Sequence, residues 1–271
     1  MKTPISYYGG KQNLISELLK LIPPHKQYVE PFVGGASLFF AKPPSDHEVI
    51  NDFNLQVVNF WEVLQSDFDR LQAKIKSTLH SEAQYIKAKK ILKADIVDPV
   101  DFAWAFYVQC HLSFSKKIYG GFTFSKDGNG GGSPQTTKNV IDEFDITRFA
   151  RVRDCEIFNR DAIDIITMKD NEETFFYLDP PYAESNCGHY EKGKDVYYRL
   201  LDILPTIKGK WLMSSYPSEQ LTALRLANGW NHKDIDKNLS VSGKHNKGKR
   251  KTECLTWNYE LESQQGKLFA A

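Results

Sequence analysis

The segment from Phe175 to Tyr182 constrains this chain more than any other, because an apolar run stops there in Asp-Pro-Pro-Tyr. The run Phe175–Leu178 is typical of a strand that is buried on both faces of a parallel sheet. Neither proline can donate a hydrogen bond to a β-ladder, so the strand must end at Asp179 and the chain must leave the sheet. Ligands of open α/β sheets bind at the carboxyl ends of the strands. The segment therefore predicts a parallel α/β sheet with a ligand site beside Asp179.

The chemistry of this tetrad suits a planar ring that carries an exocyclic amino group. The Asp179 carboxylate and the Pro180 carbonyl can each accept one amino hydrogen, while the ring stacks on Tyr182. The alternative is an ordinary strand followed by a proline turn. With each residue taken at about one in twenty, the tetrad arises by chance in roughly a few per thousand chains of this length. We therefore favour the functional interpretation.

The order of the remaining elements predicts a doubly wound sheet that is interrupted by an insertion. Leu14, Ile15 and Leu18 are spaced as on a helix, which Pro23 and Pro24 end. Further strands are expected at residues 28–33, 48–52, 155–158, 174–178, 210–215 and 253–259. From about Leu55 to Asp154 the pattern is instead mainly helical, which indicates an inserted lobe of roughly 100 residues.

Small residues follow the first strand, in the loop from Pro31 to Ser37. Gly34 and Gly35 would let a ligand approach the backbone, and the helix that follows would favour an anionic group. The loop matches neither the dinucleotide nor the triphosphate glycine pattern. Taken alone, the loop favours an ordinary connection between a strand and a helix.

Two acidic residues follow later strands, and each has two interpretations. Asp52 lies about 20 residues beyond the glycine loop, where an acidic residue commonly binds ribose hydroxyls. Asp161 follows the strand expected at 155–158 and is placed to face the same ligand. The alternative for both is a helix cap, for the helix near Asn54 and for the helix from Ala162.

Composition limits the partners and the metal chemistry. Lys plus Arg number 35 and Asp plus Glu 34, so any nucleic acid must meet local basic patches. One patch spans Lys116 to Lys126 among aromatic residues, and the other spans Lys244 to Lys251; the alternative for each is a solvated face.

No apolar run approaches the roughly 20 residues of a membrane span, and no signal peptide is evident. The scattered cysteines indicate a reduced cytoplasmic protein without a structural metal.

Together these segments resemble the Dam-like DNA adenine methyltransferases, in which a glycine loop precedes the target-recognition insert and the catalytic tetrad follows it. The resemblance rests on residues 8–11, 31–37, 51–54, Asp161 and 179–182, and continues weakly through 212–216 and 253–259. It implies a Rossmann-like fold that binds S-adenosylmethionine. It also implies an enzyme that methylates the amino group of an adenine flipped out of duplex DNA. Ala36 departs from the pattern, because many members carry a third glycine there.

The resemblance also implies domains and site residues. Residues 1–54 and 155–271 would form the catalytic domain, and 55–154 the target-recognition domain. The catalytic residues would be Asp179, Pro180, Pro181 and Tyr182. The cofactor-binding residues would be Tyr8, Gly10, Lys11, Pro31, Phe32, Gly34, Gly35, Ala36, Ser37, Asp52, Asp161 and Asp179. The DNA-binding residues would be Lys116, Lys117, Lys126, Lys247, Lys249 and Arg250.

Duplex DNA is the expected partner, in the cytoplasm of a bacterial or phage-infected cell at the nucleoid, with no metal and no membrane. Whether a cognate restriction endonuclease accompanies the chain stays open. Rival interpretations are a methyltransferase of the same fold acting on RNA or on a protein amide, a catalytically idle DNA-binding module, and a nicotinamide oxidoreductase. The protein-amide enzymes usually carry Asn where this chain has Asp179. The absent dinucleotide glycine pattern weakens the oxidoreductase.

Overall fold

The structure, a computed structural model, describes residues 1–126, 132–181, 190–238 and 250–261. Its strands are β1 (Gln27–Glu30), β2 (His47–Asn51), β3 (Glu156–Phe158), β4 (Thr174–Leu178), β5 (Lys210–Ser215), β6 (Asn231–Asn238) and β7 (Arg250–Trp257). They form a seven-stranded sheet in the order β3-β2-β1-β4-β5-β7-β6. The pairs β2–β3, β1–β4 and β4–β5 are parallel, whereas β7 runs antiparallel to both β5 and β6. The expected α/β fold is confirmed, with a mixed rather than wholly parallel sheet.

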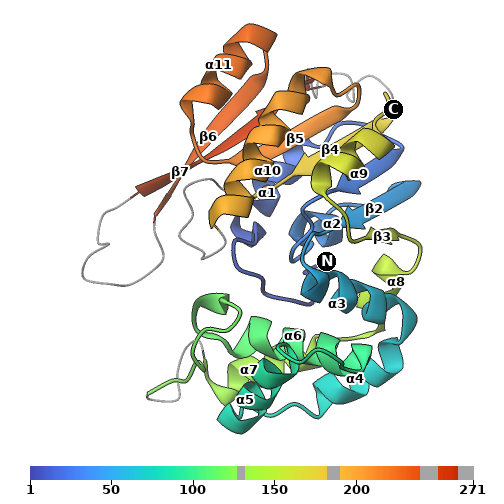
Figure 1. Cartoon of the computed structure of the whole chain (residues 1–271), viewed down its shortest axis with the longest axis vertical. Helices are drawn as coiled ribbons and strands as arrows, with labels where there is room; N and C mark the ends of the chain where they lie inside the picture. The colour runs from blue at the N-terminus through green and yellow to red at the C-terminus, as the bar shows by residue number, and fades with distance from the viewer. Residues whose placement is uncertain (127–131, 182–189, 239–249, 262–271) are drawn as a thin grey trace, which may run out of the picture. The chain divides into compact units, whose positions relative to one another are not determined.

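The chain divides into two compact units, which we describe separately (Figure 1). Unit 1 comprises Met1–Leu19, Val33–Pro44 and Glu48–Arg160, and unit 2 comprises Lys20–Phe32, Ser45–His47 and Asp161–Ala271. These units reflect the packing of the chain. The predicted boundary between a catalytic and a target-recognition domain stays a prediction.

Unit 1 is built around a helix that is apolar on nearly every face. Its helices are α2 (Ser37–Ala41), α3 (Leu55–Ser66), α4 (Phe68–Lys76), α5 (Glu82–Ile91), α6 (Pro99–Leu112), α7 (Pro134–Asp142) and α8 (Ile146–Val152). Asp98 caps α6 by accepting from the backbone of Val100, and Pro99 occupies the first turn, where no donor is needed. Residues Ala103 to Leu112 are all buried, and α3, α4 and α5 pack against α6. The helical insertion expected after β2 is therefore observed.

Unit 2 holds the strands that end in the tetrad. Its helices are α9 (Ala162–Lys169), α10 (Tyr190–Ile203) and α11 (Glu219–Asn228), preceded by α1 (Ile15–Leu21), which spans the boundary. Every residue of β4 is buried, as the apolar run predicts. Val29 of β1 pairs with Phe176 of β4, and Leu178 pairs with Met213 of β5. The carboxyl ends of these three parallel strands therefore meet at one edge of unit 2.

The structure differs from the expected strands at two places in particular, the end of β1 and the presence of β6. The first strand was expected to run to Val33, but β1 ends at Glu30, because Pro31 has no N–H group to continue the ladder. β6 was not expected, because its sequence NHKDIDKN contains one aliphatic residue, Ile235, among polar ones. It is an edge strand whose ladder is formed with β7, so no apolar face marks it in the sequence.

Candidate active site

In unit 1 the glycine loop is a tight turn whose backbone has left-handed conformations. Gly34 has a φ of 42° and Ala36 a φ of 54°, and the Ala36 amide donates to the carbonyl of Val33 at 2.6 Å. Ala36 and Ser37 are both buried. The helix that follows, α2, has only five residues, so its dipole is small. The loop is thus an ordered turn, and its Ala36 holds a conformation that glycine adopts more easily.

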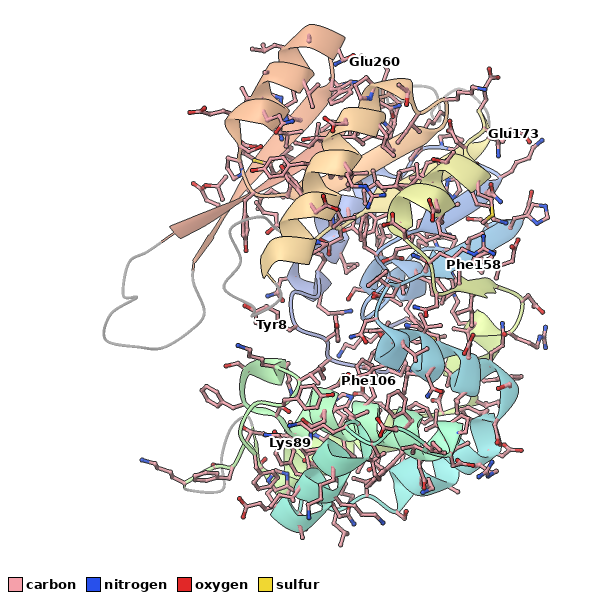
Figure 2. All side chains as sticks on the ribbon, in the orientation of Figure 1. Tyr8, Lys89, Phe106, Phe158, Glu173 and Glu260 are labelled. Atoms are coloured by element: carbon pink, nitrogen blue, oxygen red, sulfur yellow. The ribbon has the colours of Figure 1, made fainter. Side chains whose placement is uncertain are left out.

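The glycines of this loop leave room for Tyr7. A Cβ atom on Gly34 would lie 3.0 Å from Cδ1 of Tyr7, and one on Gly35 would lie 3.0 Å from Cβ of Tyr7. The Tyr7 ring also packs against Phe106 of α6, with ring centroids 5.9 Å apart (Figure 2 labels Phe106). The Trp61 indole donates to the Gly34 carbonyl at 3.2 Å. Small residues are therefore needed here for a close protein contact, which the sequence did not indicate.

Asp52 joins the end of β2 to the glycine loop. Its Oδ2 accepts from the Gly34 amide at 2.9 Å, and its Oδ1 accepts from the Asn54 amide at 2.8 Å. The helix-cap alternative does not describe it, because Asn54 itself caps α3 by accepting from the Gln56 amide. The Asn159 side chain donates to the carbonyls of Asp52 and Phe53 at 2.8 and 3.2 Å and so fixes the turn.

Burial raises the pKa of Asp52 to about 6, against the opposing effect of its backbone hydrogen bonds from Asn54, Gly34 and Phe53. A carboxylate offers about four acceptor sites, so capacity remains for a ligand hydroxyl. The next residue in the chain, Phe53, is 70% exposed. Unit 1 therefore combines a hydroxyl acceptor and an exposed aromatic ring at one turn.

The N-terminal segment contributes a buried cation. Lys11 is 7% exposed and its Nζ donates to the Gly9 carbonyl at 3.1 Å, whereas Tyr8 is 52% exposed (Figure 2). A Cβ on Gly10 would lie 3.0 Å from the Tyr7 carbonyl oxygen, which explains the glycine there. This part of the predicted site is thus ordered within unit 1.

In unit 2 the tetrad begins where β4 ends. Asp179 is half-buried, Pro180 is buried and Pro181 is exposed, while Tyr182 lies outside the described residues. The end of β1 contributes Glu30, a buried carboxylate that accepts from the Tyr28 hydroxyl at 2.7 Å.

Pro31 is buried after Glu30, and Phe32 is half-buried. Because β1 and β4 are parallel neighbours, the backbone ends of their strands are adjacent. The sequence did not single out Glu30.

Buried hydroxyls support the edge of the sheet below Asp179. The Tyr177 and Ser214 hydroxyls are hydrogen-bonded at 2.9 Å, and both residues are almost fully buried. Burial, and then the negative charge of Asp179, raise the pKa of Tyr177 well above its usual value. Tyr177 therefore stays a neutral phenol next to the strand end.

Asp161 is both a helix cap and an ion-pair partner. Its Oδ1 accepts from the Ile163 amide at 2.9 Å, which is the capping alternative stated for it. Arg199 of α10 donates to its Oδ2 at 2.8 Å and to its Oδ1 at 3.3 Å. Burial opposes ionisation, but the Arg199 and Ile163 hydrogen bonds outweigh it and hold the pKa of Asp161 below its usual value. Arg199 was not expected from the sequence, because 38 residues separate the two partners.

The first basic segment holds its lysines in different ways. The half-buried Lys116 directs its Nζ to the His111 carbonyl at 3.0 Å, and burial lowers its pKa. Lys117 and Lys126 are exposed. Tyr119 is held at a φ of 64°, and its hydroxyl accepts from Gln56 at 2.6 Å.

The second basic segment lies mostly outside the description. Lys247 and Lys249 are outside the described residues, and Arg250 is described only as the first residue of β7.

Comparison with known proteins assigns the chain to a family. A sequence profile of the D12 class N6 adenine-specific DNA methyltransferases matches residues 7–244. The chain belongs to this family. The match takes in residues 8–11, the glycine loop, Asp52, Asp161 and the tetrad, which carried the sequence-based resemblance, and it also spans the helical insertion, which did not.

Two curated relatives and one solved structure illustrate what the chain is similar to. The type II methyltransferase M.CviBI of Paramecium bursaria Chlorella virus NC1A is 25% identical over 220 residues, which are 79% of this chain and 82% of that protein. The type II methyltransferase M.MjaIII of Methanocaldococcus jannaschii is 24% identical over 208 residues, 69% and 71% of the two chains. A solved rRNA methylase from Streptococcus thermophilus gives a TM-score of 0.33 at 8% identity, over 93% of this chain and 95% of that chain. The family is thus established by sequence.

The chain is therefore an adenine-specific DNA methyltransferase, and the family implies S-adenosylmethionine as its methyl donor. The residues present fit that cofactor: Asp52 has acceptor capacity for a ribose hydroxyl, and Phe53 offers an exposed ring. Within the described ranges, no three His, Cys, Asp or Glu residues are grouped as metal ligands, and no helix is long and apolar enough to cross a membrane. That the reaction needs no metal stays a prediction.

Proposed function

We propose that the chain methylates an adenine flipped out of duplex DNA, with Asp179 and the Pro180 carbonyl accepting the two amino hydrogens and Tyr182 stacking on the base. The observation that carries the proposal is the position of Asp179 at the carboxyl end of β4, next to the end of the parallel strand β1. Asp179 is half-buried, so its charge acts in a medium that screens it less than water does.

The two acceptors address the main chemical obstacle. An adenine amino nitrogen is a poor nucleophile, because its lone pair is delocalised into the ring. Hydrogen bonds to Asp179 and Pro180 favour a pyramidal nitrogen, and they strengthen as positive charge develops on it. When bound, S-adenosylmethionine supplies an already activated sulfonium methyl group. Stacking on Tyr182 would offset part of the few kcal/mol that unstacking the base costs.

For the cofactor we propose that Asp52 accepts from the ribose hydroxyls and that Asp161 accepts from the adenine amino group. Gly34, Gly35, Ala36 and Ser37 would face its aminoacyl end, together with Lys11, Gly10 and Tyr8, and with Pro31 and Phe32. The hydrogen bond from Gly34 to Asp52 supports the pairing of loop and carboxylate. The buried Lys11 supports the recognition of a carboxylate.

For DNA we propose that Lys117, Lys126, Lys247, Lys249 and Arg250 contact phosphates. Lys117 and Lys126 are exposed, as that role needs. Lys116 is a weaker member of the set, because its ammonium already donates to the His111 carbonyl. Removing phosphate contacts should weaken binding to all sequences alike, since such contacts position the protein without reading bases.

Transfer of a labelled methyl group tests the substrate. DNA, RNA and protein are offered as separate substrates, each with and without a chelator. We expect label in DNA alone, and we expect the chelator to have no effect. Label in RNA or in protein would refute the choice of substrate.

The type II relatives make a cognate restriction endonuclease a further proposed partner, which protection of methylated host DNA from cleavage would test. The proposed place of action is the cytoplasm, at the nucleoid.

The variant Asp179→Ala tests the catalytic assignment. Loss of one preorganised polar group commonly lowers the rate roughly a hundredfold or more, and affinity for S-adenosylmethionine should change much less. Asp202→Ala is the matched control, because Asp202 is an exposed carboxylate of unit 2, on α10. Activity of Asp179→Ala close to that of the control would refute the role of Asp179.

A further inference from the structure

Arg199 holds the Asp161 carboxylate in a two-point contact within unit 2. Its Nη1 donates to Oδ2 at 2.8 Å and its Nη2 to Oδ1 at 3.3 Å. On its own helix, Nη1 also lies 3.6 Å from Oδ2 of Asp195. The guanidinium is thus placed between two carboxylates, and α9 and α10 pack against each other (Figure 1).

This contact does not serve the helix cap. Asp161 caps α9 through the Ile163 amide, which needs only Oδ1 and no partner on α10. The Arg199 side chain is 43% exposed and that of Asp161 is 29% exposed, and ion pairs at such positions contribute little to folding. A planar guanidinium bound at two points does, however, fix the orientation of a carboxylate.

The same hydrogen bonds select one acceptor position. A carboxylate has about four lone-pair sites. Oδ1 accepts from Ile163 and Arg199, and Oδ2 accepts from Arg199 alone among the hydrogen bonds of the described residues. One site therefore remains, on Oδ2, and its direction is set by Arg199. An adenine amino group can donate one hydrogen to it.

We propose that Arg199 is a positioning residue that orients Asp161 so that the remaining Oδ2 site selects the amino group of the cofactor's adenine. This inference rests on the proposed cofactor role of Asp161. It adds that the specificity for adenine depends on α10, the helix that follows the Asp-Pro-Pro-Tyr tetrad in the chain.

Binding of two ligands tests it by calorimetry. S-adenosylhomocysteine carries the amino group, and S-inosylhomocysteine carries an oxo group that cannot donate from that position. The unchanged protein should prefer the amino ligand roughly tenfold or more, as expected for a hydrogen bond to a charged acceptor. Arg199→Ala should lose most of this preference, and Arg199→Lys should keep part of it, because a lysine supplies charge without the planar fork.

The matched control is Arg70→Ala in unit 1, where Arg70 likewise donates to two carboxylates, Asp67 at 2.8 Å and Asp98 at 3.1 Å. Its ligand preference should be unchanged. If Arg199→Ala keeps the full preference while Asp161→Ala loses it, the positioning role is overturned and the cofactor role of Asp161 stands. If Asp161→Ala also keeps the preference, the cofactor assignment itself is wrong. A purely structural Arg199 would lower the melting temperature and leave the preference intact.

Discussion

The affinity for S-adenosylhomocysteine is expected to fall below about pH 6, because protonation of Asp52 removes its charge and part of its acceptor capacity for the proposed contact with the ribose hydroxyls. Burial raises the pKa of Asp52 to about 6. Apparent affinity scales with the fraction of protein in the competent form. With a pKa of about 6, about nine-tenths of Asp52 is ionised at pH 7 and about one-tenth at pH 5, so binding should weaken by up to about tenfold between them. Calorimetry across this range, with the salt concentration held constant, measures the effect.

The same ionisation acts on stability with the opposite sign. A folded-state pKa above the unfolded value means that protonated Asp52 stabilises the folded state. This contribution is fully present below the unfolded pKa of about 4 and is lost as the pH rises to about 6. Its upper limit is about 3 kcal/mol, and partial exposure of the side chain reduces it. Without ligand, urea unfolding of Asp52→Asn should therefore lack part of the decline that the unchanged protein shows between these pH values.

Asp52→Asn is also the control for affinity. It should bind S-adenosylhomocysteine more weakly than the unchanged protein does. Its affinity should also change less over this pH range, by a factor of up to about ten. All other side chains are the same in both proteins, so the difference between the two curves isolates Asp52. Parallel curves, or an unchanged protein whose affinity is flat from about pH 5 to 7, would refute the reasoning.

Three further predictions address other parts of the chain. Glu48 is buried between Arg151 and Lys42, so Glu48→Ala should lower the free energy of unfolding, measured in urea, by about 3–5 kcal/mol. Arg151→Ala should lower it less, because Glu48 then keeps its contact with Lys42 at 2.6 Å. Equal losses would contradict this. Gly35→Ala should cost about 1–3 kcal/mol through its clash with Tyr7, whereas Gly121→Ala, with nothing within 4 Å, should be nearly neutral. Replacing Lys247, Lys249 and Arg250 with Ala should make the slope of log DNA affinity against log salt concentration less steep by up to about three. An unchanged slope would exclude phosphate contact by these residues.

The sequence predicts the central strands well and the edge of the sheet poorly, for a physical reason. β4 and β5 have the bounds that their sequences predict, because central strands are buried on both faces: β4 is an almost continuous apolar run, and β5 has Trp211, Leu212 and Met213 at its centre. Residues 231–236 of β6 are exposed or half-buried, and the hydrogen bonds of β6 to β7 define it as a strand. Pairing between distant segments leaves no local pattern, so the sequence indicated β7 as a strand at 253–259 but neither β6 nor the antiparallel direction of the two strands.

The candidate site divides in the same way. Asp52 and Asp161 were predictable as acidic residues after strands, since that position follows from strand topology. Their partners were not predictable, because Gly34 lies 18 residues from Asp52 and Arg199 lies 38 residues from Asp161. The helix-cap alternative is correct as a description of Asp161 and not of Asp52. Residue type and position after a strand thus indicated where the two acidic residues lie. Their hydrogen-bond partners follow from tertiary contacts between segments that are distant in the sequence.

The direct bond between Asp52 and Gly34 changes how a mutation at this site should be interpreted. Asp52→Ala removes the proposed ribose acceptor and also leaves the Gly34 amide without this partner, at the loop that packs on Tyr7. The loss of affinity would then contain the cost of reshaping the loop as well as the lost contact, as truncation values generally do. Asp52→Asn keeps one acceptor for a backbone amide and removes the charge, so it comes closer to isolating the ribose contact. The difference in cofactor affinity between the two variants therefore estimates how much of the binding energy depends on the shape of the glycine loop.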